Sequence, residues 1–245
     1  MNKTETSDGL ERAQRQQLAA LAARQERGEA LAGWKVGLTS GSSRDAFGAG
    51  FRPFGYLLDS GIYRSGHTFW WSSTVGQQQD DLTLEGGIEN ELCFEFAQQI
   101  DAPVNAAEVR QALASVAPAF ELTQNRLQIQ GAAPSNEERL ADNLSHWGLV
   151  VGDPVPIPDN FCSDELTVRL LHNADGVSSV AGRDHMDDHF HSLAGLCNRL
   201  LDYGLSVQAG QQVITGAFGR MSEPKRGLWS GDFGELGRVH LRIER

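Results

Sequence analysis

Two glutamates, Glu89 and Glu91, lie two residues apart in the alternating stretch IENELCFEFA, residues 88–97. In a β-strand such residues project from the same face with Cβ atoms roughly 6–7 Å apart, so both carboxylates can reach one ion. Like charges this close repel unless a cation lies between them, and hard cations such as Mg²⁺ or Mn²⁺ prefer carboxylate oxygens. The pair therefore indicates a divalent-metal site, although an isolated pair is also typical of a solvated strand face.

A third glutamate favours the metal site over the solvated strand. Glu121 lies inside the apolar run VAPAFEL, residues 116–122, where an ionised carboxylate without a partner would cost several kcal/mol of folding free energy. A cation or a hydrogen-bond donor must offset that cost. We therefore predict that Glu121 is the third ligand of the ion bound by Glu89 and Glu91.

The rest of the chain predicts an α+β protein that is mainly β. Leucine and alanine recur at helical spacing in residues 8–30, and residues 88–97 alternate as a strand does. The other predicted elements are a helix from about Asn105, a strand starting at Pro118, a strand at 147–153, a hairpin turning at 173–176 and a helix at 184–203. Few long helices, short strands and 27 glycines indicate sheets with helices packed outside them.

Composition and charge exclude several classes of protein. A net charge of −11 repels polyanions, so we expect no nucleic-acid partner. No apolar run is long enough for a membrane span, and the first residues lack the apolar core of a signal peptide. The three cysteines Cys93, Cys162 and Cys197 are far apart, which fits reduced thiols. These features predict a soluble cytoplasmic protein that does not bind membranes.

Six segments follow one another in a specific order: GWKVGLTS (33–40), FGYLLD (54–59), IENELCFEF (88–96), VAPAFELTQNRL (116–127), ADNLSHWGLVVG (141–152) and VITGAFGRM (213–221). Together they resemble the fumarylacetoacetate hydrolase superfamily, specifically its 2-keto-4-pentenoate hydratase and 4-oxalocrotonate decarboxylase branch. The resemblance covers about residues 30–245. By position it places the metal ligands on Glu89, Glu91 and Glu121, and it implies Mg²⁺ or Mn²⁺ as the cofactor.

The resemblance also implies the fold and the partners. It predicts a mixed-sheet β-roll of the fumarylacetoacetate hydrolase type with flanking helices. Residues 33–245 would then form the catalytic β-rich domain, and residues 1–32 an N-terminal helical appendage. We expect the chain to form a homo-oligomer and to bind a small 2-oxo acid as its substrate.

Further site residues are predicted from the same segments. Lys35 lies between Trp34 and Val36, where a strand would bury its stem, and its family counterpart lies in the active site. We assign it to substrate-carboxylate binding or proton transfer, with a structural ion pair as the alternative. The resemblance also assigns substrate binding to Leu38 in the segment 33–40 and to Thr215 and Gly216 in the segment 213–221.

Two segments depart from the pattern of the family. Relatives carry an acidic residue just before the Phe-Gly at position 54, whereas this chain has Arg52-Pro53. Asp59 is the nearest acid, so we predict it as a substitute catalytic residue. The segment RDHMDDHFH, residues 183–191, replaces a loop of small residues and proline. Its two histidines at helical spacing suit zinc, but acids that favour a helix start explain the segment better.

The predicted function is a metal-dependent hydratase for a small unsaturated 2-oxo or 2-hydroxy acid of the 2-hydroxypentadienoate type. In such an acid the carboxylate and keto oxygens can chelate a metal, which stabilises the enolate. A 4-oxalocrotonate-type decarboxylase is the alternative, because it needs the same electron sink. A C–C bond hydrolase is disfavoured. Relatives with that activity use a lysine downstream of the third carboxylate, and residues 122–224 contain no lysine. A 2-oxo-acid-binding homologue with altered chemistry is the non-enzymatic alternative.

Overall fold

Two mixed β-sheets form the body of the protein in this computed structural model, which describes residues 3–71, 81–82, 86–124, 127, 133–221 and 225–244. The larger sheet runs in the order β2 (Phe54–Leu58), β1 (Leu31–Val36), β11 (Gln212–Ile214), β6 (Gly86–Phe96), β7 (Leu113–Gln124), β8 (His146–Val151) and β3 (Ile62–Arg64), with β12 (Arg220–Met221) also paired to β6. The smaller runs in the order β10 (Asp175–Ala181), β9 (Thr167–His172), β13 (Gly227–Asp232), β14 (Arg238–Glu244), β4 (His67–Trp71) and β5 (Asp81–Leu82). The predicted mainly β, α+β architecture is confirmed.

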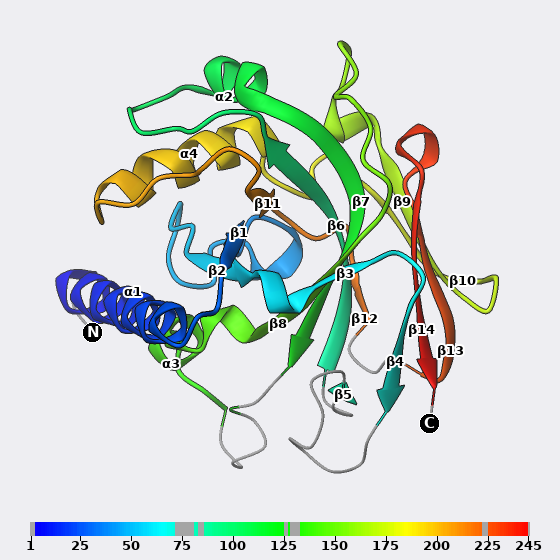
Figure 1. Ribbon diagram of the computed structural model, residues 1–245, viewed down its shortest axis with the longest axis horizontal. Helices are drawn as coiled ribbons and strands as arrows, with labels where there is room; N and C mark the ends of the chain where they lie inside the picture. Colours follow the sequence, from blue (N-terminus) through cyan, green and yellow to red (C-terminus); the bar gives the residue numbers. More distant parts are fainter. Residues whose placement is uncertain are drawn as a thin grey trace.

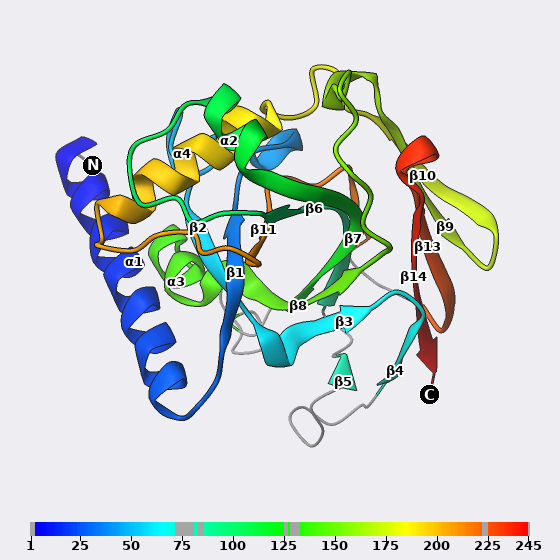
Figure 2. The same ribbon diagram turned by 45° about the horizontal axis from the view of Figure 1, so that its top comes forward.

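The helices cover one side of the larger sheet. They are α1 (Lys3–Glu26), α2 (Ala106–Ala112), α3 (Asn136–Ala141) and α4 (His189–Leu201). In both ribbon views they lie on the side away from β13 and β14, so the larger sheet separates the helices from the smaller sheet (Figures 1 and 2). Within the described ranges no helix combines the length and apolar character needed to cross a bilayer.

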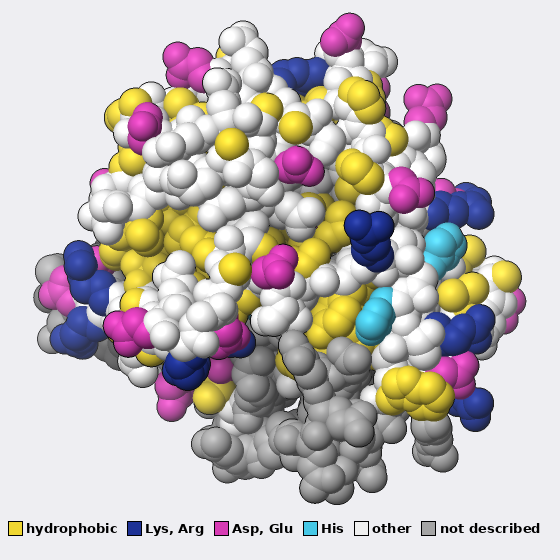
Figure 3. Space-filling model, viewed as in Figure 1, with side chains coloured by type: hydrophobic (Ala, Val, Ile, Leu, Met, Phe, Trp, Pro, Cys, Tyr) yellow, Lys and Arg dark blue, Asp and Glu magenta, His cyan; other side chains and the backbone are white. Residues whose placement is uncertain are grey.

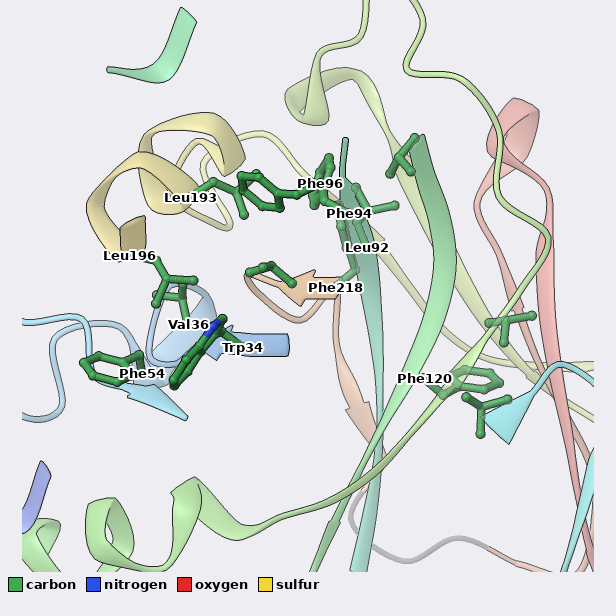
Figure 4. Packing of buried hydrophobic residues seen from close by; sticks show 14 of the residues in the cluster. Trp34, Val36, Phe54, Leu92, Phe94, Phe96, Phe120, Leu193, Leu196 and Phe218 are labelled. Carbon is green, nitrogen blue, oxygen red and sulfur yellow. The ribbon is translucent and has the colours of Figure 1, made fainter. Parts of the chain in front are cut away.

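Apolar side chains fill both faces of the larger sheet. Figure 4 shows Leu193 and Leu196 of α4 next to side chains of β1 and β6, whereas Phe120 of β7 points towards the smaller sheet. Gly231 of β13 allows this approach, because a Cβ there would lie 3.1 Å from the Phe120 ring. The alternation along β7 therefore sends Phe120 into the core between the sheets and leaves its neighbour Glu121 for the other face.

Two buried glutamines attach α1 to the rest of the protein. The Gln17 amide donates hydrogen bonds to the carbonyl oxygens of Phe54 at 3.0 Å and Leu140 at 2.9 Å, and Gln14 donates to Gln17. One side chain thus links α1 to β2 and to α3. The division into residues 1–32 and 33–245 stays a prediction, and β1 begins at Leu31, just before that boundary.

Several predicted elements are confirmed, but some boundaries differ: the first helix spans Lys3–Glu26 and not residues 8–30. The hairpin turns at Asn173 and Ala174, whose φ angles of 49° and 74° give the left-handed turn expected there. Pro118 does not start a strand but lies inside β7 opposite Leu92, because continuous pairing with β6 outweighs the one donor that proline lacks. The last helix begins at His189 and not at residue 184, because Asp188 caps it by accepting from His191 N.

The visible face carries no basic patch. Lysine and arginine side chains are scattered among acidic ones over the described residues in Figure 3, and the chain has a net charge of −11. The absence of a nucleic-acid partner stays a prediction from the net charge.

His189 makes the stability of the fold sensitive to acid. Its ring lies buried between Phe94 and Phe218, at centroid distances of 5.7 and 5.8 Å. Burial lowers its pKa to about 4, whereas an unfolded histidine titrates near 6.5. Between these values the unfolded chain gains a proton and the folded protein does not. The free energy of unfolding should therefore fall as pH drops from about 6.5 to 4, by roughly 3 kcal/mol in total.

Urea titrations at pH 7, 6, 5 and 4.5 would measure this loss. His189→Phe should flatten the dependence on pH, whereas the same change at His191, which is exposed, should leave it unchanged. An equally steep loss of stability in His189→Phe would contradict the assignment to this ring.

Candidate metal and substrate site

The register between β6 and β7 brings the three glutamates together. Glu89 pairs directly with Glu121, and Glu91 pairs with Ala119, so all three carboxylates leave the same face of adjacent strands. Their oxygens offer ligand positions within 4.8 Å of one another. Glu91 and Glu121 are buried, and Glu89 is half-buried. The structure thus assembles the three residues selected from the sequence.

Glu121 also binds two cationic or polar partners. Lys35 Nζ donates to Glu121 Oε1, and His146 Nδ1 lies 2.8 Å from the same oxygen. Burial alone would raise the pKa of this carboxyl, but the Lys35 charge and the His146 hydrogen bond outweigh it and lower the pKa to about 2. Both partners use Oε1, so Oε2 takes part in neither contact.

Glu89 and Glu91 carry an excess of negative charge. Burial, and then the charge of Glu121, raise the pKa of both carboxyls. Arg220 Nη1 lies 3.4 Å from Glu89, and the Gly216 backbone N–H donates to Glu91 Oε2 at 2.7 Å. These two contacts offset only part of the repulsion. A divalent cation between the three carboxylates would offset the rest.

The donor set fits a hard divalent cation. It consists of carboxylate oxygens only, which Mg²⁺ and Mn²⁺ accept, whereas zinc sites usually include nitrogen or sulfur ligands. Among the residues that the structure describes, this is the only group of three or more His, Cys, Asp or Glu side chains close enough to share an ion. The zinc interpretation of His185 and His189 gains no support, since His189 faces aromatic rings.

A cavity of about 850 Å³ lies over the three glutamates. Lys35 and Leu38 line it from β1 and the loop that follows, and Gly216 lines it from the segment after β11. Thr215 is buried beside this wall, and its carbonyl oxygen accepts a hydrogen bond of 2.5 Å from Thr39 Oγ1. At Gly216, where φ is 151°, a Cβ would lie 2.4 Å from Thr39 Oγ1, so glycine permits this close approach.

Asp59 is not brought to this site. β1 and β2 run antiparallel with Lys35 opposite Gly55 and Leu31 opposite Leu58. Asp59 therefore follows the far end of β2, where its backbone N–H donates to Ala30 O. It is exposed and does not line the cavity. Its predicted catalytic role gains no support from its position, because strand direction places it at the opposite end from the glutamates.

The two departures from the family pattern contact each other. Arg52 Nε lies 2.5 Å from Asp187 Oδ2, and its Nη1 lies 2.6 Å from Asp45 Oδ1. Asp187 N also donates to Thr39 O. Arg52 therefore holds the acidic segment 183–188 against the loop after β1. This contact places His185 on the cavity wall, with Nε2 at 3.2 Å from Ala217 O.

Four basic or histidine side chains around the cavity were not selected from the sequence as site residues. His146 contacts Glu121, and Arg139, His185 and Arg220 line the cavity. His146 stands directly before the apolar run of β8, which was a usable signal for an inward polar group. The sequence contains no comparable signal for the two arginines, because their neighbours along the chain do not indicate where α3 and β12 lie.

Comparisons with known proteins find relatives in sequence and in fold, although no family model matches the chain. A 2-hydroxypent-2,4-dienoate hydratase from Pseudomonas putida is 29% identical over 182 residues, covering 73% of this chain and 77% of the relative. A 2-oxo-hept-4-ene-1,7-dioate hydratase from Escherichia coli is 24% identical over 222 residues, covering 88% and 80%. The solved 4-oxalocrotonate decarboxylase from Pseudomonas putida G7, complexed with magnesium and adipate, has a TM-score of 0.80 at 21% identity, over 93% of this chain and 83% of that chain. The predicted resemblance to the fumarylacetoacetate hydrolase superfamily is confirmed.

The fumarylacetoacetate hydrolase fold accounts for the sheet order around the site. β1 pairs with β11, β11 with β6 and β6 with β7, so Lys35, Gly216 and the three glutamates come from neighbouring strands or the loops that follow them. The match to the decarboxylase confirms the predicted mixed-sheet fold class.

Proposed function

We propose that this protein is a metal-dependent hydratase for a small unsaturated 2-oxo or 2-hydroxy acid. The observation that carries the proposal is the cluster of Glu89, Glu91 and Glu121 beside the buried Lys35 in one cavity. The hydratases among the relatives act on 2-hydroxydienoates or an unsaturated oxo diacid, as their names state. The decarboxylase neighbour favours the alternative, release of CO₂ from a related acid.

Glu89, Glu91 and Glu121 would hold Mg²⁺ or Mn²⁺. When bound, the ion polarises the 2-oxo group and makes the neighbouring C–H more acidic. Of the chain's own groups, Gly216 N–H orients Glu91, and His146 orients Glu121. These hydrogen bonds fix both carboxylates before substrate arrives, as is usual for the groups around a metal site.

Lys35 Nζ would hold the substrate carboxylate or move a proton. The ammonium group is buried and bonded to Glu121, so its charge is screened less than that of an exposed lysine. Leu38 and Gly216 would shape the wall beside the substrate, and Thr215, which does not line the cavity, would support this wall through its hydrogen bond from Thr39. The homo-oligomeric assembly stays a prediction.

Turnover assays would test the proposal. The protein is incubated with Mg²⁺ and 2-hydroxypent-2,4-dienoate and, in a separate assay, with Mg²⁺ and 4-oxalocrotonate. The loss of dienoate absorbance is followed, and the mass of the product is measured by mass spectrometry. We expect a product heavier by one water, no released CO₂, loss of the activity with EDTA and recovery with added Mg²⁺. Release of CO₂ from 4-oxalocrotonate without hydration would establish the alternative. Failure to convert either acid with metal bound would refute both.

A further inference from the structure

Two arginines line the same cavity as the glutamates. Arg220 lies beside the acidic cluster, with Nη1 at 3.4 Å from Glu89 and Nη2 at 3.4 Å from Thr123 Oγ1. Arg139 comes from α3, and its guanidinium carbon lies 5.6 Å from the centre of the Phe47 ring. Within the described part of the chain, Arg139 forms no ion pair with a carboxylate. It is therefore a half-buried cation on the wall of the cavity, and no described carboxylate pairs with it.

The two guanidinium groups lie close enough to affect each other. Burial, and then the charge of Arg220, lower the pKa of Arg139. Two cations that face one cavity and repel each other favour an anion between them or beside them. The contact of Arg139 with Phe47 is made through the face of the ring and uses no carboxylate, so the N–H groups of the guanidinium can bind a carboxylate in the paired geometry that suits arginine.

The net charge around the cavity also favours an anionic ligand. Among the described residues that line it, the carboxylates are Glu89, Glu91 and Glu121, and the cations are Lys35, Arg139 and Arg220. These six charges cancel. A divalent ion adds two positive charges, of which a monocarboxylate neutralises one and a dicarboxylate neutralises both. Leaving a partly buried charge unpaired is costly, so a ligand with two carboxylates fits the site better.

We propose that the preferred substrate is a dicarboxylate, whose 2-oxo end faces the three glutamates and Lys35 and whose second carboxylate binds Arg139 with Arg220 beside it. The inference rests on the proposed metal-dependent reaction and narrows its substrate class. The cavity of about 850 Å³ has room for it, since small-molecule pockets measure roughly 300–1,000 Å³.

Calorimetry with two matched ligands tests this on the unmodified protein. In the presence of Mg²⁺, 2-oxoadipate and 2-oxohexanoate are compared; both are six-carbon 2-oxo acids, and they differ only in the second carboxylate. Because a charge-assisted pair contributes about 1.5–3 kcal/mol, 2-oxoadipate should bind roughly tenfold to a hundredfold more tightly. Equal affinity for the two acids would overturn the proposal.

Arg139→Gln locates the preference. This variant should lose most of the advantage of 2-oxoadipate and keep its affinity for 2-oxohexanoate. The control is Arg15→Gln, which removes the same charge from another arginine stacked on a ring, at 5.3 Å from Tyr203 and outside the cavity. Equal weakening of both acids in Arg139→Gln would assign the residue a structural role and overturn its part in recognition.

The comparison also separates this inference from the proposed function. Binding of both acids only with Mg²⁺, but without preference for the dicarboxylate, would overturn the inference and leave the metal site supported. If neither acid binds in the presence of Mg²⁺, the metal-dependent reaction itself fails, and the dicarboxylate assignment fails with it.

Discussion

Replacing Glu121 with glutamine is expected to abolish turnover and to weaken the binding of Mg²⁺ by at least about a hundredfold. Loss of a partner one shell away from a metal already costs about 10–100-fold in affinity, and Glu121 is itself a proposed ligand. The neutral amide also leaves the buried Lys35 without its ion pair. Isothermal titration with Mg²⁺, or with Mn²⁺ followed by electron paramagnetic resonance, would measure the loss.

Glu95→Gln is the matched control for this experiment. Glu95 is half-buried on β6, the same strand as Glu89 and Glu91, but it pairs with Ser115 and does not line the cavity. Its replacement should leave the affinity for metal within about twofold, since substitutions away from such a site have small effects. Unchanged Mg²⁺ binding in Glu121→Gln would remove this residue from the metal site.

Replacing Lys35 with methionine should have the opposite effect on the metal. Without the ammonium group, Glu121 Oε1 keeps only the contact with His146, so no fixed cation competes with the ion for this carboxylate. We expect Mg²⁺ to bind as tightly as in the unmodified protein or more tightly. Turnover should still fall by roughly a hundredfold to ten-thousandfold, the range typical of a lost proton-transfer group.

Lys35→Arg separates the two roles assigned to this residue. Arginine keeps the positive charge but does not release its proton in proteins. Turnover close to that of the unmodified protein would establish carboxylate binding. Loss of turnover with an unchanged KM would establish proton transfer. Metal-dependent turnover that survives intact in Lys35→Met would contradict both roles and leave the structural ion pair with Glu121.

The acidic cluster could be predicted because it depends on local rules. Strand alternation places Glu89 and Glu91 on one face, and the apolar run around Glu121 demands compensation for a buried charge. The partners of Glu121 could not be predicted from these rules. Lys35 reaches Glu121 only because β1, β11, β6 and β7 are neighbours in that order, and periodicity within one strand carries no information about the order of strands.

Asp59 illustrates the same limit, because its predicted role depended on proximity in the sequence. Asp59 is the acid nearest to Phe54 in the sequence. In the structure the five residues of β2 lie between Asp59 and the end of the strand that pairs near Lys35. The exchange of an acid for Arg52 was visible in the sequence, as was the acidic segment 183–188. That Arg52 pairs with Asp187 was not, because the two residues are 135 positions apart.

The two hydrogen bonds of Gln17 have a consequence for the order of assembly during synthesis. Gln17 leaves the ribosome early, but one of its acceptors, Leu140 O, is 123 residues further along the chain. A buried amide without an acceptor is costly, so α1 gains this anchor only after β2 and α3 have both been made. Although α1 is translated before α3, it therefore completes its docking only once α3 has been made, and until then its apolar side, with Leu10 and Leu21, lacks this cover.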